Sequence, residues 1–99
     1  MFEYEFGSIV ISKAGHDKGK YFIILKEDPE YVYLSDGKYR PVERPKRKKK
    51  KHVQCVRFTD GSLADKKAKN EAIINEDVKR AIKLFKNKQL KTKQEDKLE

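Results

Sequence analysis

Five short runs rich in β-branched and aromatic residues, each bounded by turn-forming residues, occupy the first 58 positions of this 99-residue chain. They cover residues 8–12, 20–25, 31–34, 39–42 and 52–58. Runs of this length are too short for stable helices, and their side chains favour strands. Because closing a small sheet removes the exposed edges through which strands aggregate, five such strands predict a small β-barrel. The predicted fold class is therefore mainly β, with a five-stranded barrel.

Turn signals fix how the predicted strands connect. The polar loop at residues 13–19 holds two glycines. Asp36-Gly37 predicts a tight hairpin, because a type I′ turn needs φ above zero at both central residues. Pro41 cannot donate a ladder hydrogen bond, so we expect the strand at residues 39–42 to lie at a sheet edge or to end early.

The sequence changes to a helical pattern from Asp60 onward. Asn75 is placed to cap a helix, and residues 62–65 have the form of a capping-box variant. Four apolar residues of the later helix share one face at helical spacing: Val78, Ala81, Ile82 and Phe85. A short helix is marginal in water by itself, so this stripe must dock on the barrel, which we favour, or on a partner protein.

These patterns divide the chain into three parts. Residues 1–59 form the predicted barrel and residues 60–90 a short C-terminal helical extension. Residues 91–99 have only Leu98 to bury, so we expect a frayed charged tail there.

The basic charge of the chain is confined to one segment. Residues 38–57 carry ten basic residues against one acidic residue, Glu43, and this excess equals the formal charge of +9 of the whole protein. A segment of one sign inside an otherwise balanced chain concentrates positive potential and attracts a polyanion. Because strand-like sequence flanks the run, we expect a basic loop of a folded domain.

The residue types in this segment suit a nucleic-acid backbone. Lysine ammonium groups act as point charges along phosphates, whereas guanidinium groups bind phosphate as a fork or stack. Unpaired bases can stack on Tyr21, Tyr31, Tyr33 or Tyr39, although tyrosines on small barrels are also half-buried packing residues. A solvated loop that aids solubility, or a nuclear-localisation signal in a eukaryote, stays open. The candidate RNA-binding residues of this segment are Lys38, Tyr39, Arg40, Arg44, Lys46, Arg47, Lys48, Lys49, Lys50, Lys51 and His52.

Three segments of the chain carry a family resemblance. Residues 7–25, with two strands around the loop Gly15-His16-Asp17-Lys18-Gly19-Lys20, resemble a KOW motif. Residues 12–19, then Asp36-Gly37-Lys38-Tyr39-Arg40, then a basic run ending in Lys51-His52-Val53, resemble the L14e/L6e/L27e-like group of KOW-domain ribosomal proteins and its small bacterial relatives. The resemblance covers residues 6–58 and implies an SH3-like barrel. It also implies RNA contact through the first loop, which maps onto Lys13, Gly15, His16, Asp17, Lys18, Gly19 and Lys20.

The expected function is RNA binding, with ribosomal RNA and ribosomal proteins as partners and with a monomeric state away from the ribosome. A ribosomal subunit, a ribosome-associated factor and a free RNA binder all stay open. Binding to duplex DNA also stays open, because phosphate contacts do not distinguish polyanions. The alternative from another class is a protein-protein interaction module of the translation or transcription machinery.

Several function classes are not expected. No segment is apolar enough to span a bilayer and the N-terminus lacks a leader pattern, so we expect a cytoplasmic protein. Cys55 is the only cysteine, which excludes an internal disulfide and fits a reducing compartment. Its predicted strand position favours a buried, inert thiol, and His52 with Cys55 supplies at most two metal ligands. We expect no enzyme activity, no cofactor and no metal site.

Overall fold

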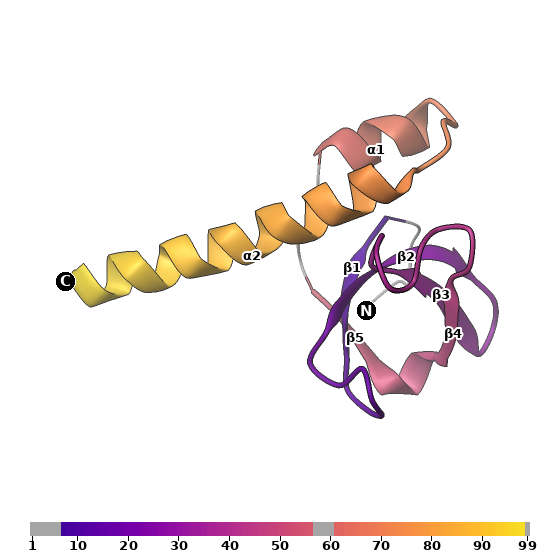
Figure 1. Ribbon diagram of the computed structural model, residues 1–99, viewed down its shortest axis with the longest axis horizontal. Coiled ribbons are helices and arrows are strands. Elements are labelled where there is room, and N and C mark those ends of the chain that lie inside the picture. The colour runs from indigo at the N-terminus through magenta and orange to yellow at the C-terminus, as the bar shows by residue number, and fades with distance from the viewer. Residues whose placement is uncertain (1–6, 57–60, 99) are drawn as a thin grey trace.

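The computed structural model describes residues 7–56 and 61–98, with side chains up to Lys88. Residues 7–56 form one antiparallel sheet of five strands in the order β4-β3-β2-β1-β5, and two helices follow (Figure 1). The elements are β1 (Ile9–Ser12), β2 (Tyr21–Glu27), β3 (Tyr31–Ser35), β4 (Lys46–Lys49), the 3-10 turn η1 (Lys50–His52), β5 (Val53–Cys55), α1 (Gly61–Ala68) and α2 (Asn75–Leu98). The prediction of a mainly β domain with a C-terminal helical extension is confirmed.

The predicted closure of the sheet into a barrel is not confirmed. Within the described residues β4 and β5 are the two edge strands, and no pairing joins them. The single turn η1 leads directly from one edge to the other, and Figure 1 shows the sheet curled, with η1 between β4 and β5. The concave face holds one apolar core, which consists of Val10, Phe22, Ile24, Val32, Leu34, Val53 and Cys55.

The opposite face of β1 and β2 is covered by the helices. Ile9 and Ile23 alternate with the residues of the concave core and pack against α2 and α1. All four residues of the predicted stripe on α2 are buried in this second core: Val78, Ala81, Ile82 and Phe85. The stripe therefore docks on the sheet, as favoured above. Burying each large apolar side chain contributes roughly 1.5–3 kcal/mol, which holds α2 in place.

The predicted strand at residues 39–42 is absent, and the basic run is not a loop. Residues 36–40 instead form a turn in which the Asp36 carboxylate accepts hydrogen bonds from the backbone N–H groups of Lys38 and Arg40, at 2.9 and 2.8 Å. Such side-chain bonds compete with a sheet ladder. The partner of β3 is β4, formed by the basic residues themselves.

The start of α2 differs in detail from the predicted cap. Asn75 lies inside the helix, and its Oδ1 accepts a hydrogen bond from the Val42 N–H at 2.8 Å. The helix is capped from within, because the Asp77 carboxylate accepts from the Ile74 N–H at 3.0 Å. Ser62 likewise lies inside α1 and not before it. Residues 91–98, expected as a frayed tail, belong to α2 in the structure.

Candidate nucleic-acid interface

The loop between β1 and β2 is a compact turn. Gly15 and Gly19 adopt φ values of +80° and +87°, in the left-handed region that favours glycine. The Gly19 N–H donates to the Ser12 carbonyl at 2.9 Å, which closes the loop at its base. A Cβ at Gly19 would meet no atom within 4 Å, so this glycine is required by backbone conformation alone. The loop exposes the side chains of Lys13, His16, Lys18 and Lys20.

This loop lies directly against the basic segment. The Lys48 ammonium donates to the Ala14 carbonyl at 2.7 Å, and Lys46 forms an ion pair with Asp17. The backbone N–H of Lys13 donates to the His52 carbonyl at 2.8 Å. Two segments that are separated by about thirty positions in the sequence therefore lie side by side.

The contacts between the loop and β4 are partly buried, and the pKa values of the charged groups there are shifted. A hydrogen bond from Lys46 holds the pKa of the Asp17 carboxyl below its ordinary value of 3.8, although burial opposes this shift. Burial lowers the pKa of the Lys48 ammonium, and the neighbouring Lys46 adds to the effect. Asp17, Lys46 and Lys48 therefore attach the loop to β4. Lys50 is likewise engaged, with Glu27 at 2.6 Å.

The other two residues of β4 point to the opposite side. Successive side chains of a strand alternate between faces, so Arg47 and Lys49 are exposed where Lys46 and Lys48 turn inward. The Arg47 guanidinium lies over the ring of Tyr31 at 4.5 Å from the centroid. We call Arg47 and Lys49 the outer pair of β4.

The predicted site residues thus fall into three groups. The exposed ones are Lys13, Gly15, His16, Lys18, Gly19, Lys20, Lys38, Tyr39, Arg40, Arg44, Arg47, Lys49 and Lys51. Lys46, Lys50 and His52 are half-buried, and Asp17 and Lys48 are buried. Asp17 and Lys48, which were expected to contact RNA, are each only 9% exposed.

Lys38 and Tyr39 are not beside β4. They face the far end of the first loop, where Lys20 lies 6.0 Å from the Tyr39 ring. A groove there includes Lys79, Lys83 and Lys86 of α2, which sequence reasoning missed. Their spacing of four and three residues beside the buried stripe is the signal that would have found them.

The ion pair of Asp17 predicts a dependence of stability on pH. Because its folded pKa is lowered, the stabilisation is present above the unfolded pKa of 3.8 and is lost as pH falls through the folded value. We expect the free energy of unfolding to fall as the pH drops below about 5, and to fall less steeply in Asp17→Asn than in the native protein. Urea unfolding at several pH values measures both slopes.

A matched control for this experiment is Asp65→Asn. Asp65 pairs with Lys69 on the exposed surface of α1, and such surface pairs contribute little. Asp77 also has a lowered pKa; burial opposes the shift, while hydrogen bonds from Lys66 and the Ile74 N–H produce it. Some pH dependence therefore persists in Asp17→Asn. Equal slopes in Asp17→Asn and the native protein would contradict the assigned role of Asp17.

Two comparisons with known proteins give no match: neither a protein-family model nor a curated protein is similar to this chain. The resemblance to KOW-domain proteins stays a prediction. Among the described residues, no helix combines the length and apolar character needed to cross a membrane. No group of three or more potential metal ligands occurs in the same part of the chain. Cys55 is buried in β5, and burial raises the pKa of its thiol.

Proposed function

We propose that this protein binds structured RNA, either ribosomal RNA or RNA at the ribosome, through the first loop and the exposed residues of the basic segment. The observation that carries the proposal is the direct contact between the loop and β4 through Lys48, Lys46 and the Lys13 backbone. These contacts hold the first loop beside the basic segment. The exposed cations of the two segments are Lys13, Lys18, Lys20, Arg47, Lys49 and Lys51.

The inward and the outward basic residues have different roles. The inward lysines fix the loop on the strand, so the loop keeps one conformation when a ligand arrives. The outward residues are exposed and meet phosphates, with Arg47 supplying a planar fork and the lysines supplying point charges. Contacts of this kind fix the position of an RNA backbone without reading its sequence.

We propose further that the sheet is an SH3-like barrel of the KOW type whose last seam is bridged by side chains. The antiparallel strand order and the single helical turn η1 between β4 and β5 support this assignment. The ion pair between Lys46 and Asp17 links the edge strand β4 to the loop between β1 and β2. The alternative function, a protein-protein interaction module, would use either the barrel or the apolar stripe of α2 as its contact surface. The stripe packs on the sheet and is therefore not exposed to a partner.

Removing the outer pair of β4 tests this function. If six phosphates are neutralised, log Kd of a ribosomal RNA stem-loop changes with log salt with a slope of magnitude about 4 to 5. In Arg47→Gln/Lys49→Gln we expect about tenfold weaker binding at physiological salt and a slope smaller by about 1.5 to 2. Fluorescence anisotropy across a salt series gives both quantities.

The control removes the same charge elsewhere. Lys67→Gln/Lys69→Gln changes two exposed residues, one at the end of α1 and one directly after it, and this helix lies away from β4 and η1 (Figure 1). We expect this variant to bind nearly as the native protein does. Equal losses in the two double variants would show that total charge, and not this surface, determines binding. Competition with duplex DNA of equal length separates RNA binding from binding to any polyanion.

A further inference from the structure

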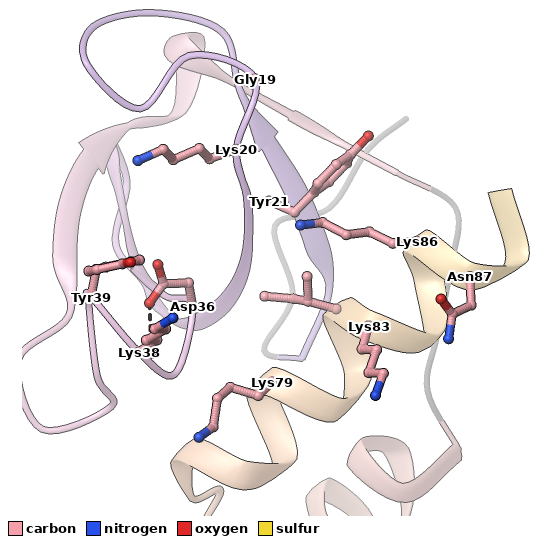
Figure 2. Close-up of a pocket in the computed structure, with 11 residues that line it drawn as sticks. Gly19, Lys20, Tyr21, Asp36, Lys38, Tyr39, Lys79, Lys83, Lys86 and Asn87 are labelled. Atoms are coloured by element: carbon pink, nitrogen blue, oxygen red, sulfur yellow. Dashed lines mark hydrogen bonds between the residues drawn. The ribbon is translucent and has the colours of Figure 1, made fainter. Parts of the chain in front are cut away.

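A groove of about 610 Å³ lies between the sheet and α2. Three segments distant in the sequence form its walls: the end of the first loop, the turn at residues 36–40 and one face of α2 (Figure 2). Its lining residues are Gly19, Lys20, Tyr21, Asp36, Lys38, Tyr39, Lys79, Ile82, Lys83, Lys86 and Asn87. The volume lies within the range of ordinary ligand pockets, roughly 300–1,000 Å³.

The groove is held open by packed backbone. A Cβ at Gly37 would lie 2.6 Å from the Asn75 carbonyl oxygen, so the turn touches the first residues of α2. Asn75 also accepts the Val42 N–H through its side chain, and Ser35 Oγ accepts the Gly37 N–H at 3.0 Å. The turn and the helix are therefore fixed relative to one another, and a ligand meets a preformed site.

The charge of the groove is strongly positive. It contains five lysines and one carboxylate, Asp36, which already accepts two backbone N–H groups of its own turn. Figure 2 shows the Lys86 side chain extending from α2 toward Tyr21 of the sheet, the Lys20 side chain extending away from the helix on the side of Tyr39, and Lys83 pointing out of the groove. Lys79 is paired with Glu76 at 2.9 Å and faces the turn. Such a groove attracts phosphate groups.

Tyr39 distinguishes this groove from a plain anion site. Its side chain is 75% exposed, although it stands on a turn that is otherwise well tied to the fold. The ammonium groups of Lys38 and Lys20 lie 5.1 and 6.0 Å from the ring centroid. An aromatic ring on a rigid turn, flanked by cations, matches a base with its neighbouring phosphates.

We propose that this groove binds a single-stranded RNA segment, with one unpaired base stacked on Tyr39 and adjacent phosphates near Lys20, Lys38 and Lys86. The inference rests on the proposed RNA-binding function and adds the kind of RNA recognised. A duplex hides the faces of its bases, so the ring selects an unpaired nucleotide. Because Lys20 belongs to both the first loop and the groove, a strand leaving a stem held by the loop enters the groove directly.

The test compares two RNAs: a blunt stem-loop and the same stem-loop with a single-stranded tail of six uridines. We expect the native protein to bind the tailed RNA about tenfold more tightly, since stacking of one base together with tail phosphates is worth that much. Tyr39→Ala should lose most of this gain, which is measured as the ratio of the variant's affinities for the two RNAs. Tyr39→Phe should keep the gain, because its ring also stacks.

Several outcomes decide between explanations. Arg47→Gln/Lys49→Gln should weaken the binding of both RNAs but keep the gain in affinity from the tail. This result would show that the groove contributes to binding independently of β4. A native protein that binds the stem-loop without gain from the tail overturns this inference alone, whereas failure to bind either RNA overturns the proposed function. The inference is wrong if Tyr39→Ala keeps the full gain, or if a poly-glutamate peptide displaces the tail as effectively as single-stranded RNA does. In either case the groove is an anion site without base stacking.

Discussion

Replacing Gly37 with alanine is expected to destabilise the protein by about 3 kcal/mol, the largest loss expected for a Gly→Ala substitution among the described glycines. Gly37 adopts φ of +77°, a conformation that costs other residues about 1 kcal/mol or more. The added Cβ would also lie 2.6 Å from the Asn75 carbonyl oxygen and 3.2 Å from the Lys79 nitrogen. Both atoms are backbone, so α2 must shift, and forced overpacking typically costs 1–3 kcal/mol.

Gly19→Ala provides the matched control for Gly37→Ala. Gly19 has a similar φ of +87°, but nothing lies within 4 Å of its Cβ position. The control therefore measures conformational strain alone, and we expect a loss of about 1 kcal/mol. Urea unfolding followed by circular dichroism gives both values. If the two variants are equally destabilised, the close contact between the turn and α2 does not constrain the fold.

Truncating Phe85 to alanine is expected to cost about 3–4 kcal/mol, within the range for buried Phe→Ala substitutions. Phe85 is buried against the sheet, and its ring meets Tyr21 edge-on at 5.1 Å between centroids. Leu84, the adjacent residue, is 44% exposed, so Leu84→Ala is the matched control and should cost less than about 1 kcal/mol. Urea unfolding measures the difference.

Phe85→Ala should destabilise the packing of α2 before it destabilises the sheet. The core under α2 and the concave core of the sheet share no residue, so weakening the first leaves the second intact. We therefore expect the amides of α2 to lose protection from hydrogen exchange while those of β2 and β3 keep it. Uniform loss of protection would mean that the two cores unfold as one unit. Equal destabilisation by Leu84→Ala would contradict the docking of this helix face.

The first three strands and the apolar stripe of α2 were accessible from the sequence. Residues 21–25 and 31–34 are dense in β-branched and aromatic side chains, and the stripe from Val78 to Phe85 follows the helical period. In these segments local preference and tertiary packing agree. Sequence reasoning also placed the first loop and the basic segment on one side of the sheet domain. The contacts of Lys46 and Lys48 with that loop show that the two segments are adjacent.

The strand β4 was not accessible in this way. Six consecutive basic residues show no alternation of apolar and polar positions, and lysine is a poor strand former. The strand exists because β3 supplies pairing partners and Arg47 stacks on Tyr31. The hairpin predicted at Asp36-Gly37 is wrong for a related reason. The Asp36 side chain accepts hydrogen bonds from backbone N–H groups that a hairpin ladder needs. The groove escaped because Tyr39 and Lys79 are forty positions apart.

The alternation along β4 has a consequence for how a basic run is understood. In a linear signal or a charged tether, the order of the lysines matters little as long as the total charge is kept. Here the parity of each position assigns its side chain either to the attachment of the first loop or to the outside. Inserting or deleting one lysine between positions 46 and 49 exchanges these assignments along part of the strand. The role of each basic residue in this segment therefore depends on the face of β4 that it occupies, as well as on its charge.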